Sequence, residues 1–354
     1  MGKDPYVGSG LWYPPFSALF FLPYQIFDAA RAYSIHVFVL VLLTIASVWW
    51  SINIAESAVA QGASSHVAGD FGMTISLFLS LAFLTLSSYG FLFGVERGNI
   101  DVYPLVLCLA GLWVLVRYPK RLWLQVILFS AAAHLKVYPA VLLLLPLWRQ
   151  GRRSLVPIVV VNAVLLFCIG PGPALHFIET LSGVAASPEV WVGNHSAASF
   201  GQMLNGFLGE RWGFTIPSAA LVGLPLAIWL VSAFALFRRR YTDSGATWLF
   251  AMSVPLMNLI PGTSHDYKLV LLVAPFAILL RLLTGEYVTS GRWSPLAQVI
   301  LACGLLILLS VSYIAVPPAL GNKYPLIVGS QLLLLWSLST FKYPSPGLMA
   351  DVAA

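Results

Sequence analysis

Charged side chains beside long apolar runs are the first candidates for chemistry in this sequence, because charge is costly to bury in apolar surroundings. The densest group holds Glu96, Arg97, Asn99 and Asp101. Arg97 can neutralise its acidic neighbours at a helix start, where acids also favour the helix dipole. The group is therefore either a structural ion-pair cluster or part of a functional site.

Lys136 lies near Tyr138 in an apolar segment that Pro139 interrupts, and proline disfavours helix at the residue before it. No acid lies within four residues of this lysine. An ammonium group at such a break suits a phosphate. The alternative is that the side chain extends to a membrane interface.

A second polar group follows an apolar run further along the chain. His265 and Asp266 are adjacent and stand just before Lys268. A histidine beside an acid is either a proton-transfer pair or part of a polar loop. Asn194 and Ser196 belong to a tripeptide with the pattern of a glycosylation acceptor, which is too common by chance to assign that use.

The sequence predicts neither a metal site nor a nucleotide-driven reaction. No glycine-rich phosphate loop of the P-loop type occurs. The remaining histidines lack a second ligand at metal-site spacing, and the cysteines sit inside apolar runs as small core residues: His36, His66, His176, Cys108, Cys168 and Cys303. We therefore expect no cofactor.

Composition excludes a soluble globular domain, because 59% of the 354 residues are hydrophobic and only 9% are charged. A bilayer core about 30 Å thick needs roughly 20 apolar residues per helix, and such runs recur along the chain. We predict an all-α, polytopic transmembrane helix bundle with about 9–10 spans. The apolar runs are 34–54, 72–94, 101–117, 154–171, 216–237, 245–261, 267–284, 295–316 and 323–341.

The apolar segment 122–148 has basic residues at both ends. If both ends are cytoplasmic, the segment must enter the membrane and return. The break near Lys136 divides it into two half-helices, and irregular backbone at that depth must face the interior of the bundle. We predict a re-entrant helical pair there, and a membrane-edge helix at 15–30.

The basic residues also predict the orientation. Lysine and arginine gather in the loops 117–121, 149–153 and 238–240, which the positive-inside rule places in the cytoplasm. The polar turns 96–101 and 262–266 and a long loop over 172–215 then lie on the opposite, non-cytoplasmic face. We predict a single transmembrane domain over 1–354, divided into an outer-face segment (1–33), a helical bundle (34–342) and a cytoplasmic tail (343–354).

Four short segments, taken in order, resemble a known family. They are Gly2 to Tyr6 followed by Tyr13-Pro14-Pro15, then Arg97-Gly98-Asn99, then Ala131 to Pro139, and last Gly193 to Ser196. Together they resemble the polyprenyl-phosphate-dependent, mannosyltransferase-like enzymes of glycosyltransferase family 87, in the GT-C superfamily. The resemblance covers about residues 2–200, and beyond it only a series of spans and the polar turn at His265 and Asp266 match.

The resemblance implies an enzyme that moves a sugar, a mannose-like hexose or arabinose, from a polyprenyl-phosphate donor to a glycan, lipid or cell-envelope acceptor. It implies a cavity on the non-cytoplasmic face of the inner (plasma) membrane, between membrane lipids, with no nucleic acid partner. The departing phosphate would meet a cation such as Lys136, Arg97 or Lys268. This chemistry needs a base and charge stabilisation, and requires neither a nucleotide nor a tightly held metal.

The start of the chain departs from the family pattern. The family places its catalytic aspartate upstream of the Gly-x-x-Pro-Tyr segment, after a first span, and Asp4 is not the matching residue. We expect either that a first span and its base are missing, which would impair catalysis until both are restored, or that another residue substitutes. The substitutes are Asp101, Glu96, His265 and Asp266, and the residues expected to bind substrate are Glu96, Arg97, Asn99, Lys136, Tyr138, Asn194, Ser196 and Lys268.

Two other functions fit the same features. A transporter or flippase of lipid-linked sugars would share the spans, the broken segment and the buried Lys136. Transporters usually contain internal repeats, and no repeat is visible in this sequence. An inactive scaffold is the other alternative, and it fits the expectation that a first span is missing.

The orientation gives a first testable prediction. A cysteine placed at Ser187, in the segment 172–215, should react with a membrane-impermeant thiol reagent from the non-cytoplasmic side only, because the basic loops lie in the cytoplasm. A cysteine at Arg152 is the control and should react only from the cytoplasmic side. Labelling of the Ser187 cysteine from the cytoplasmic side alone would overturn the orientation.

Overall fold

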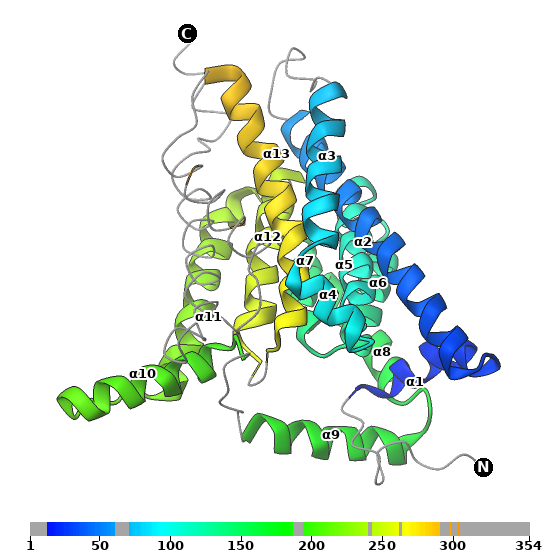
Figure 1. Cartoon of the computed structure of the whole chain (residues 1–354), viewed down its shortest axis with the longest axis vertical. Helices are drawn as coiled ribbons and strands as arrows, with labels where there is room; N and C mark the ends of the chain where they lie inside the picture. The colour runs from blue at the N-terminus through cyan, green and yellow to red at the C-terminus, as the bar shows by residue number, and fades with distance from the viewer. Residues whose placement is uncertain are drawn as a thin grey trace.

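The chain is an all-α, polytopic helix bundle, as the composition predicts (Figure 1). The computed structural model describes residues 13–60, 71–186, 194–239, 243–261 and 264–290, together with Gln298 and Gly304. All regular secondary structure in these ranges is helical. The predicted spans 295–316 and 323–341, the predicted tail, His66, Cys303 and the segment from Gly2 to Tyr6 lie outside the described residues.

The described residues form eighteen helical elements. In chain order they are α1 (Pro15–Phe21), η1 (Leu22–Ile26), α2 (Ala29–Ala60), α3 (Phe71–Leu86), α4 (Tyr89–Glu96), α5 (Val102–Arg117), α6 (Leu122–Leu135), η3 (Tyr138–Leu143), α7 (Leu144–Gln150), η4 (Gly151–Ser154), α8 (Leu155–Leu166), α9 (Pro171–Ala186), α10 (Ala197–Trp212), α11 (Ser218–Ala235), η5 (Leu236–Arg239), α12 (Asp243–Leu259), η6 (Asp266–Leu272) and α13 (Val273–Ser290).

Several of these helices have the length and apolarity of membrane spans. In the described part of the chain, Ala29–Ser57 passes this test alone. Two broken pairs pass it together: Gly72–Leu86 with Tyr89–Glu96, bent by 50°, and Tyr138–Leu166 with Pro171–Ser182, bent by 102°. The predicted span over 72–94 is therefore bent, and its two helices pass the test only together. Ser88 divides it, because its hydroxyl caps α4 by accepting a hydrogen bond from the amide of Phe91.

The predicted break in segment 122–148 is confirmed. Helix α6 ends at Leu135, Lys136 is extended (φ −147°, ψ 140°), and a 3-10 segment, η3, follows before α7. Pro139 lies at the start of η3, where a missing backbone donor is tolerated. The break therefore exposes the lysine side chain to the bundle interior, while the backbone on both sides stays helical.

The segment 172–215 is not the long loop that the sequence analysis predicted. It contains α9 and α10, which lie across one end of the bundle, at the bottom of Figure 1. Ser196 caps α10 by accepting a hydrogen bond from the amide of Ser199, and Gly213 ends it in the left-handed region (φ 64°). These capping residues are the sequence signal that the loop prediction overlooked.

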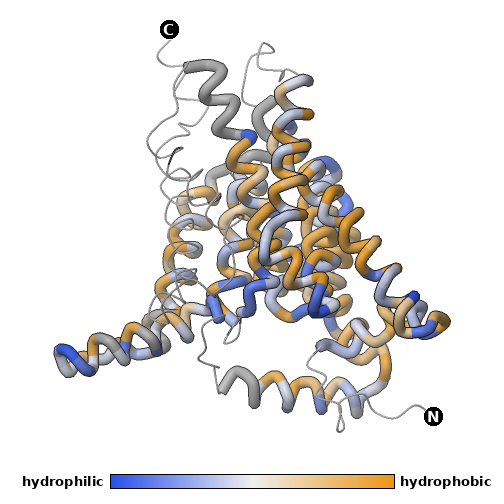
Figure 2. The backbone as a smooth tube through the Cα atoms, in the orientation of Figure 1, coloured by the Kyte–Doolittle hydropathy of each residue, from blue (hydrophilic) through white to orange (hydrophobic). Residues whose placement is uncertain are grey.

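The helix surfaces are apolar where a bilayer would cover them. Figure 2 shows mostly hydrophobic helix shafts, with hydrophilic segments gathered towards the end of the bundle where α9 and α10 lie. Phe83 and Phe234 are 70% and 82% exposed on the outside of α3 and α11. Such exposure of large aromatic side chains suits lipid contact rather than water.

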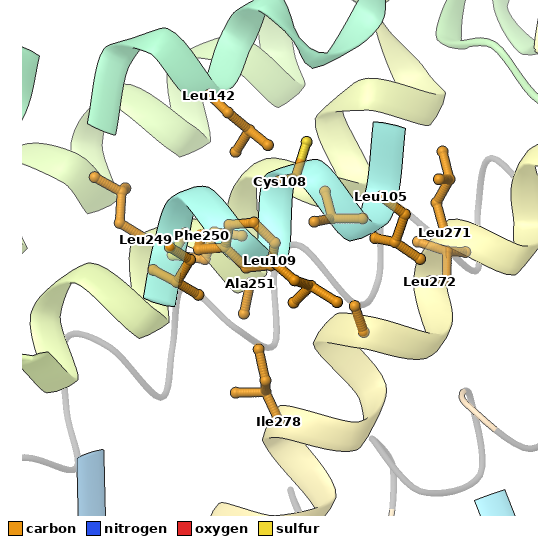
Figure 3. Close-up of a cluster of buried hydrophobic side chains, with 14 of the residues drawn as sticks. Leu105, Cys108, Leu109, Leu142, Leu249, Phe250, Ala251, Leu271, Leu272 and Ile278 are labelled. Carbon is orange, nitrogen blue, oxygen red and sulfur yellow. The ribbon is translucent and has the colours of Figure 1, made fainter. Parts of the chain in front are cut away.

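Helix α5 runs through the centre of the core. Figure 3 shows its residues Leu105, Cys108 and Leu109 surrounded by buried side chains of η3, α12, η6 and α13. Cys108 is fully buried, which confirms it as a core residue, whereas Cys168 is only half-buried. Because Asp101 directly precedes this helix, the core fixes the position of the first polar residue of the site.

Close packing of α5 against α6 depends on Gly111. A Cβ atom at this position would lie 2.8 Å from Cε1 of the buried Phe129 ring. We predict that Gly111→Ala lowers the free energy of unfolding by about 1–3 kcal/mol, because the ring must move within a packed core. Thermal unfolding of the purified protein in detergent measures this change.

Gly206 on α10 provides the matched control, since a Cβ atom there meets nothing within 4 Å. Gly206→Ala should leave the melting temperature unchanged or raise it, because alanine favours helix over glycine. Equal melting temperatures for Gly111→Ala and the unchanged protein would contradict the close packing of α5 and α6.

Candidate functional site

Polar residues from four separate parts of the chain meet at the end of the bundle that faces α9 and α10. They come from the start of α5, the break between α6 and η3, the segment 194–196 before α10, and the start of η6. All four parts carry buried polar or charged side chains. We call this group the polar cluster, and its members are Asn99, Asp101, Lys136, Tyr138, Asn194, His195, Ser196, Ser264, His265, Asp266, Tyr267 and Lys268.

The centre of the polar cluster is a buried ion pair. Lys136 Nζ lies 3.3 Å from Asp101 Oδ1, and the hydroxyl of Tyr138 donates a 2.6 Å hydrogen bond to the same oxygen. Asp101 is 2% exposed and Lys136 is 8% exposed. The acid that Lys136 lacks nearby in sequence is therefore supplied by the start of α5. Removal of either charge would leave the other buried and unpaired, which is strongly destabilising.

Asn99 holds Asp101 in place. Its side-chain oxygen accepts a 3.0 Å hydrogen bond from the Asp101 amide, and Gly98 provides the turn after α4 with φ 59°. Helix α4 in turn packs closely on η6, because a Cβ atom at Gly90 would lie 3.1 Å from the Asp266 carbonyl oxygen. The glycine allows α4 to bring the two acid-bearing segments together.

The second acid, Asp266, is paired with His195 through a hydrogen bond to Nε2, and both side chains are almost fully buried. The His195 amide donates to the Ser264 carbonyl (2.7 Å), and the Ser264 amide donates to Asn194 Oδ1 (2.8 Å). The Ser196 amide also donates to Asn194 Oδ1, at 3.1 Å. These bonds attach the segment before α10 to the start of η6.

His265 precedes Asp266 in the sequence, but the side chain that hydrogen-bonds Asp266 Oδ1 is His195. Sequence analysis named Asn194 and Ser196 and missed the histidine between them. The polar tripeptide directly before the capped start of α10 was the signal available.

Aromatic rings join the two halves of the polar cluster. Lys136 Nζ lies 4.5 Å from the centre of the Tyr13 ring and 5.5 Å from that of Tyr267. It also donates a 3.2 Å hydrogen bond to the Tyr13 hydroxyl. Lys268 Nζ, itself buried, lies 4.9 Å from the centre of the Tyr138 ring. Each ring face stabilises a desolvated ammonium group, so two cations are held close together.

The two lysines also lower the pKa of His265. Burial, followed by the charges of Lys268 and Lys136, lowers the pKa of His265 to about 4. This imidazole is therefore neutral at physiological pH and can accept a hydrogen bond or a proton.

Both acids keep one oxygen available for a ligand. Asp101 Oδ2 and Asp266 Oδ2 are buried and have no hydrogen-bond partner among the described residues. Buried carboxylate oxygens are nearly always hydrogen-bonded in folded proteins. The arrangement therefore offers two acceptor atoms beside two ammonium groups, which suits a ligand that carries both hydroxyls and an anionic group.

Two predicted residues lie outside the polar cluster. Glu96 and Arg97 are exposed at the end of α4, and the Arg97 guanidinium lies over the Phe93 ring at 5.1 Å. The other predicted site residues all belong to the polar cluster. Across the described ranges, no three histidine, cysteine, aspartate or glutamate side chains are arranged to hold a metal ion.

Comparison with known proteins identifies the family. The family model described as Glycosyltransferase family 87 matches residues 11–261. No curated protein and no solved structure matches the chain. The matched range includes Asp101, Lys136 and His195, and it spans more than half of the 354 residues. Together with the apolar helix bundle, this match means that the chain belongs to glycosyltransferase family 87, of the GT-C type, and is a membrane glycosyltransferase.

Proposed function

We propose that this enzyme transfers a sugar from a polyprenyl-phosphate donor to a glycan, lipid or cell-envelope acceptor. The observation that carries the proposal is the pair of buried lysine side chains, Lys136 and Lys268, beside two carboxylates whose Oδ2 atoms have no hydrogen-bond partner among the described residues. A lipid phosphate is anionic and leaves as an anion. Cations that are positioned in advance within a low-dielectric site stabilise that leaving group more than water would.

The reaction follows from these groups. The acceptor hydroxyl oxygen forms a bond to the anomeric carbon of the sugar, while the bond from that carbon to the phosphate oxygen breaks. The electron pair of the broken bond stays with the phosphate, which Lys136 and Lys268 bind. The hydroxyl proton passes to a carboxylate acting as general base.

Asp266 is the carboxylate that suits the base. Its Oδ1 is held by His195, which orients the group, and its Oδ2 remains available. Asp101 already accepts from both Lys136 and Tyr138 on its Oδ1. We assign Asp101 to holding the cation and Asp266 to accepting the proton.

The substrate class and location extend the same proposal. A mannose-like hexose or arabinose is the sugar, and the lipid chain lies along the apolar helix surfaces, such as that around Phe83. The polar cluster lies at the end of the bundle opposite the basic loops around 117–121 and 149–153. The positive-inside rule supports a non-cytoplasmic active face in the inner (plasma) membrane.

Substitution of Lys136 tests phosphate binding. Lys136→Met should lower transfer by at least about 100-fold, since a charge-assisted contact to the leaving group is lost. It should also destabilise the fold, because Asp101 is left buried and unpaired. Transfer of labelled sugar from a synthetic polyprenyl-phosphate mannose or arabinose, together with thermal unfolding in detergent, measures both effects.

The double variant Lys136→Met/Asp101→Asn separates stability from activity. It removes both charges, so the melting temperature should recover towards that of the unchanged protein while transfer stays low. Lys136→Arg keeps a cation and should retain part of the activity if charge alone is needed. Full transfer by the stable double variant would show that Lys136 has no part in binding the phosphate.

Comparison of Asp101→Asn with Asp266→Asn identifies the base. Asp266→Asn should lower kcat by about 10²–10⁴-fold, the usual effect of losing a general base. Asp101→Asn should mainly raise KM for the donor, because it releases Lys136. The reverse pattern would assign the base to Asp101, and unchanged kcat in both variants would exclude both acids.

A further inference from the structure

Asn258 is a buried polar residue that the mechanism above does not use. It lies on α12 and has no exposed surface. Neither its Oδ1 nor its Nδ2 has a hydrogen-bond partner among the described residues. A buried amide without partners destabilises a fold and is rare in native proteins. Its presence therefore calls for a role other than folding.

Helix geometry places Asn258 near the level of Asp101. Ala251 of α12 and Leu109 of α5 belong to the same group of buried side chains (Figure 3). Asn258 lies seven residues after Ala251, which is about 10.5 Å further along α12 on the same face. Asp101 lies eight residues before Leu109, which is about 12 Å along α5.

The distance along α12 to Asn258 and the distance along α5 to Asp101 both run towards the same end of the bundle. Ser264, which follows α12, accepts a hydrogen bond from the amide of His195 in the polar cluster. Helix α12 therefore ends where α5 begins. It also packs against η3, α5 and η6, the elements that carry or directly follow Tyr138, Asp101 and Lys268. The last turns of α12, which carry Asn258, thus lead towards the polar cluster.

The chemistry of the amide indicates what it binds. An amide offers both an acceptor oxygen and donor hydrogens, and two adjacent hydroxyls of a sugar can pair with both at once. A phosphate would use only the donors and leave Oδ1 without a partner. The cations Lys136 and Lys268 already suit the phosphate, so the amide suits the sugar.

We propose that Asn258 binds adjacent hydroxyls of the transferred sugar and so determines which sugar the enzyme accepts. This inference rests on the proposed transfer from a polyprenyl-phosphate sugar. A site built to hydrogen-bond a hydroxyl discriminates strongly against a substrate that lacks it, because the protein groups are then left unpaired. Asn258 is accordingly a specificity-determining residue rather than a catalytic one.

The test combines a variant with altered donors. Asn258→Leu has nearly the same size and removes the unpartnered amide, so its melting temperature should equal or exceed that of the unchanged protein. Transfer is measured from synthetic polyprenyl-phosphate mannose and from its 2-, 3-, 4- and 6-deoxy analogues. The unchanged enzyme should use one or two of the deoxy donors about 10–100-fold less well than the parent donor, and Asn258→Leu should use them as well as the parent donor.

Ser253→Ala is the matched control on the same helix. The Ser253 hydroxyl accepts from the Trp229 indole at 2.8 Å and donates to the Leu249 carbonyl at 2.7 Å. This variant should lower the melting temperature and leave the ranking of the donors unchanged, because its hydrogen bonds serve folding.

The outcomes separate the two proposals. Transfer by the unchanged enzyme together with the same ranking of deoxy donors in Asn258→Leu would overturn the role of Asn258 alone. A lower melting temperature for Asn258→Leu would overturn it too, because it would reveal a folding role for the amide. No transfer from either mannosyl or arabinosyl polyprenyl phosphate by the unchanged enzyme would overturn the proposed function, and the sugar-binding role of Asn258 with it.

Discussion

The ion pair between Lys136 and Asp101 is the interaction on which the rest of the site depends. Both charged side chains are buried, so each is stabilised by the other. The pair joins the break after α6 to the start of α5, across 35 residues of sequence. The hydroxyl of Tyr138 bonds the same carboxylate, which fixes the start of η3 as well. The need to pair these two buried charges thus determines how the break after α6, the start of α5 and the start of η3 pack together.

The site is built twice from the same kind of element. Both η3 and η6 are 3-10 segments that carry an aromatic ring of the polar cluster, Tyr138 in η3 and Tyr267 in η6. The lysine lies just before η3 in one case (Lys136) and within η6 in the other (Lys268). Irregular backbone within a membrane protein is tolerated where surrounding protein buries it. Helix α12 packs against both segments, and Gly90 lets α4 approach η6 from the other side. The surrounding helices therefore bury the irregular backbone of these short segments, so the segments can hold charged side chains within the bundle.

The sequence predicted the fold class and the break at Lys136, because hydropathy and proline act locally. It also predicted most members of the polar cluster, since charge in apolar surroundings is conspicuous. The sequence did not predict which charged side chains pair with one another. The pairs of Lys136 with Asp101 and of His195 with Asp266 join segments far apart in the chain, and one sequence holds no record of such contacts. The helices α9 and α10 were missed because hydropathy alone does not identify helices that lie across the end of a bundle.

The charge balance of the polar cluster also gives His265 a place in the proposed reaction. Two ammonium groups face two carboxylates, and the remaining repulsion from Lys268 and Lys136 helps to keep the pKa of His265 at about 4. A phosphate bound by those lysines would cancel that repulsion, so the pKa of His265 would rise when the donor binds. Departure of the phosphate would reverse the change. In the proposed reaction, the proton affinity of His265 is therefore coupled to occupancy of the phosphate site.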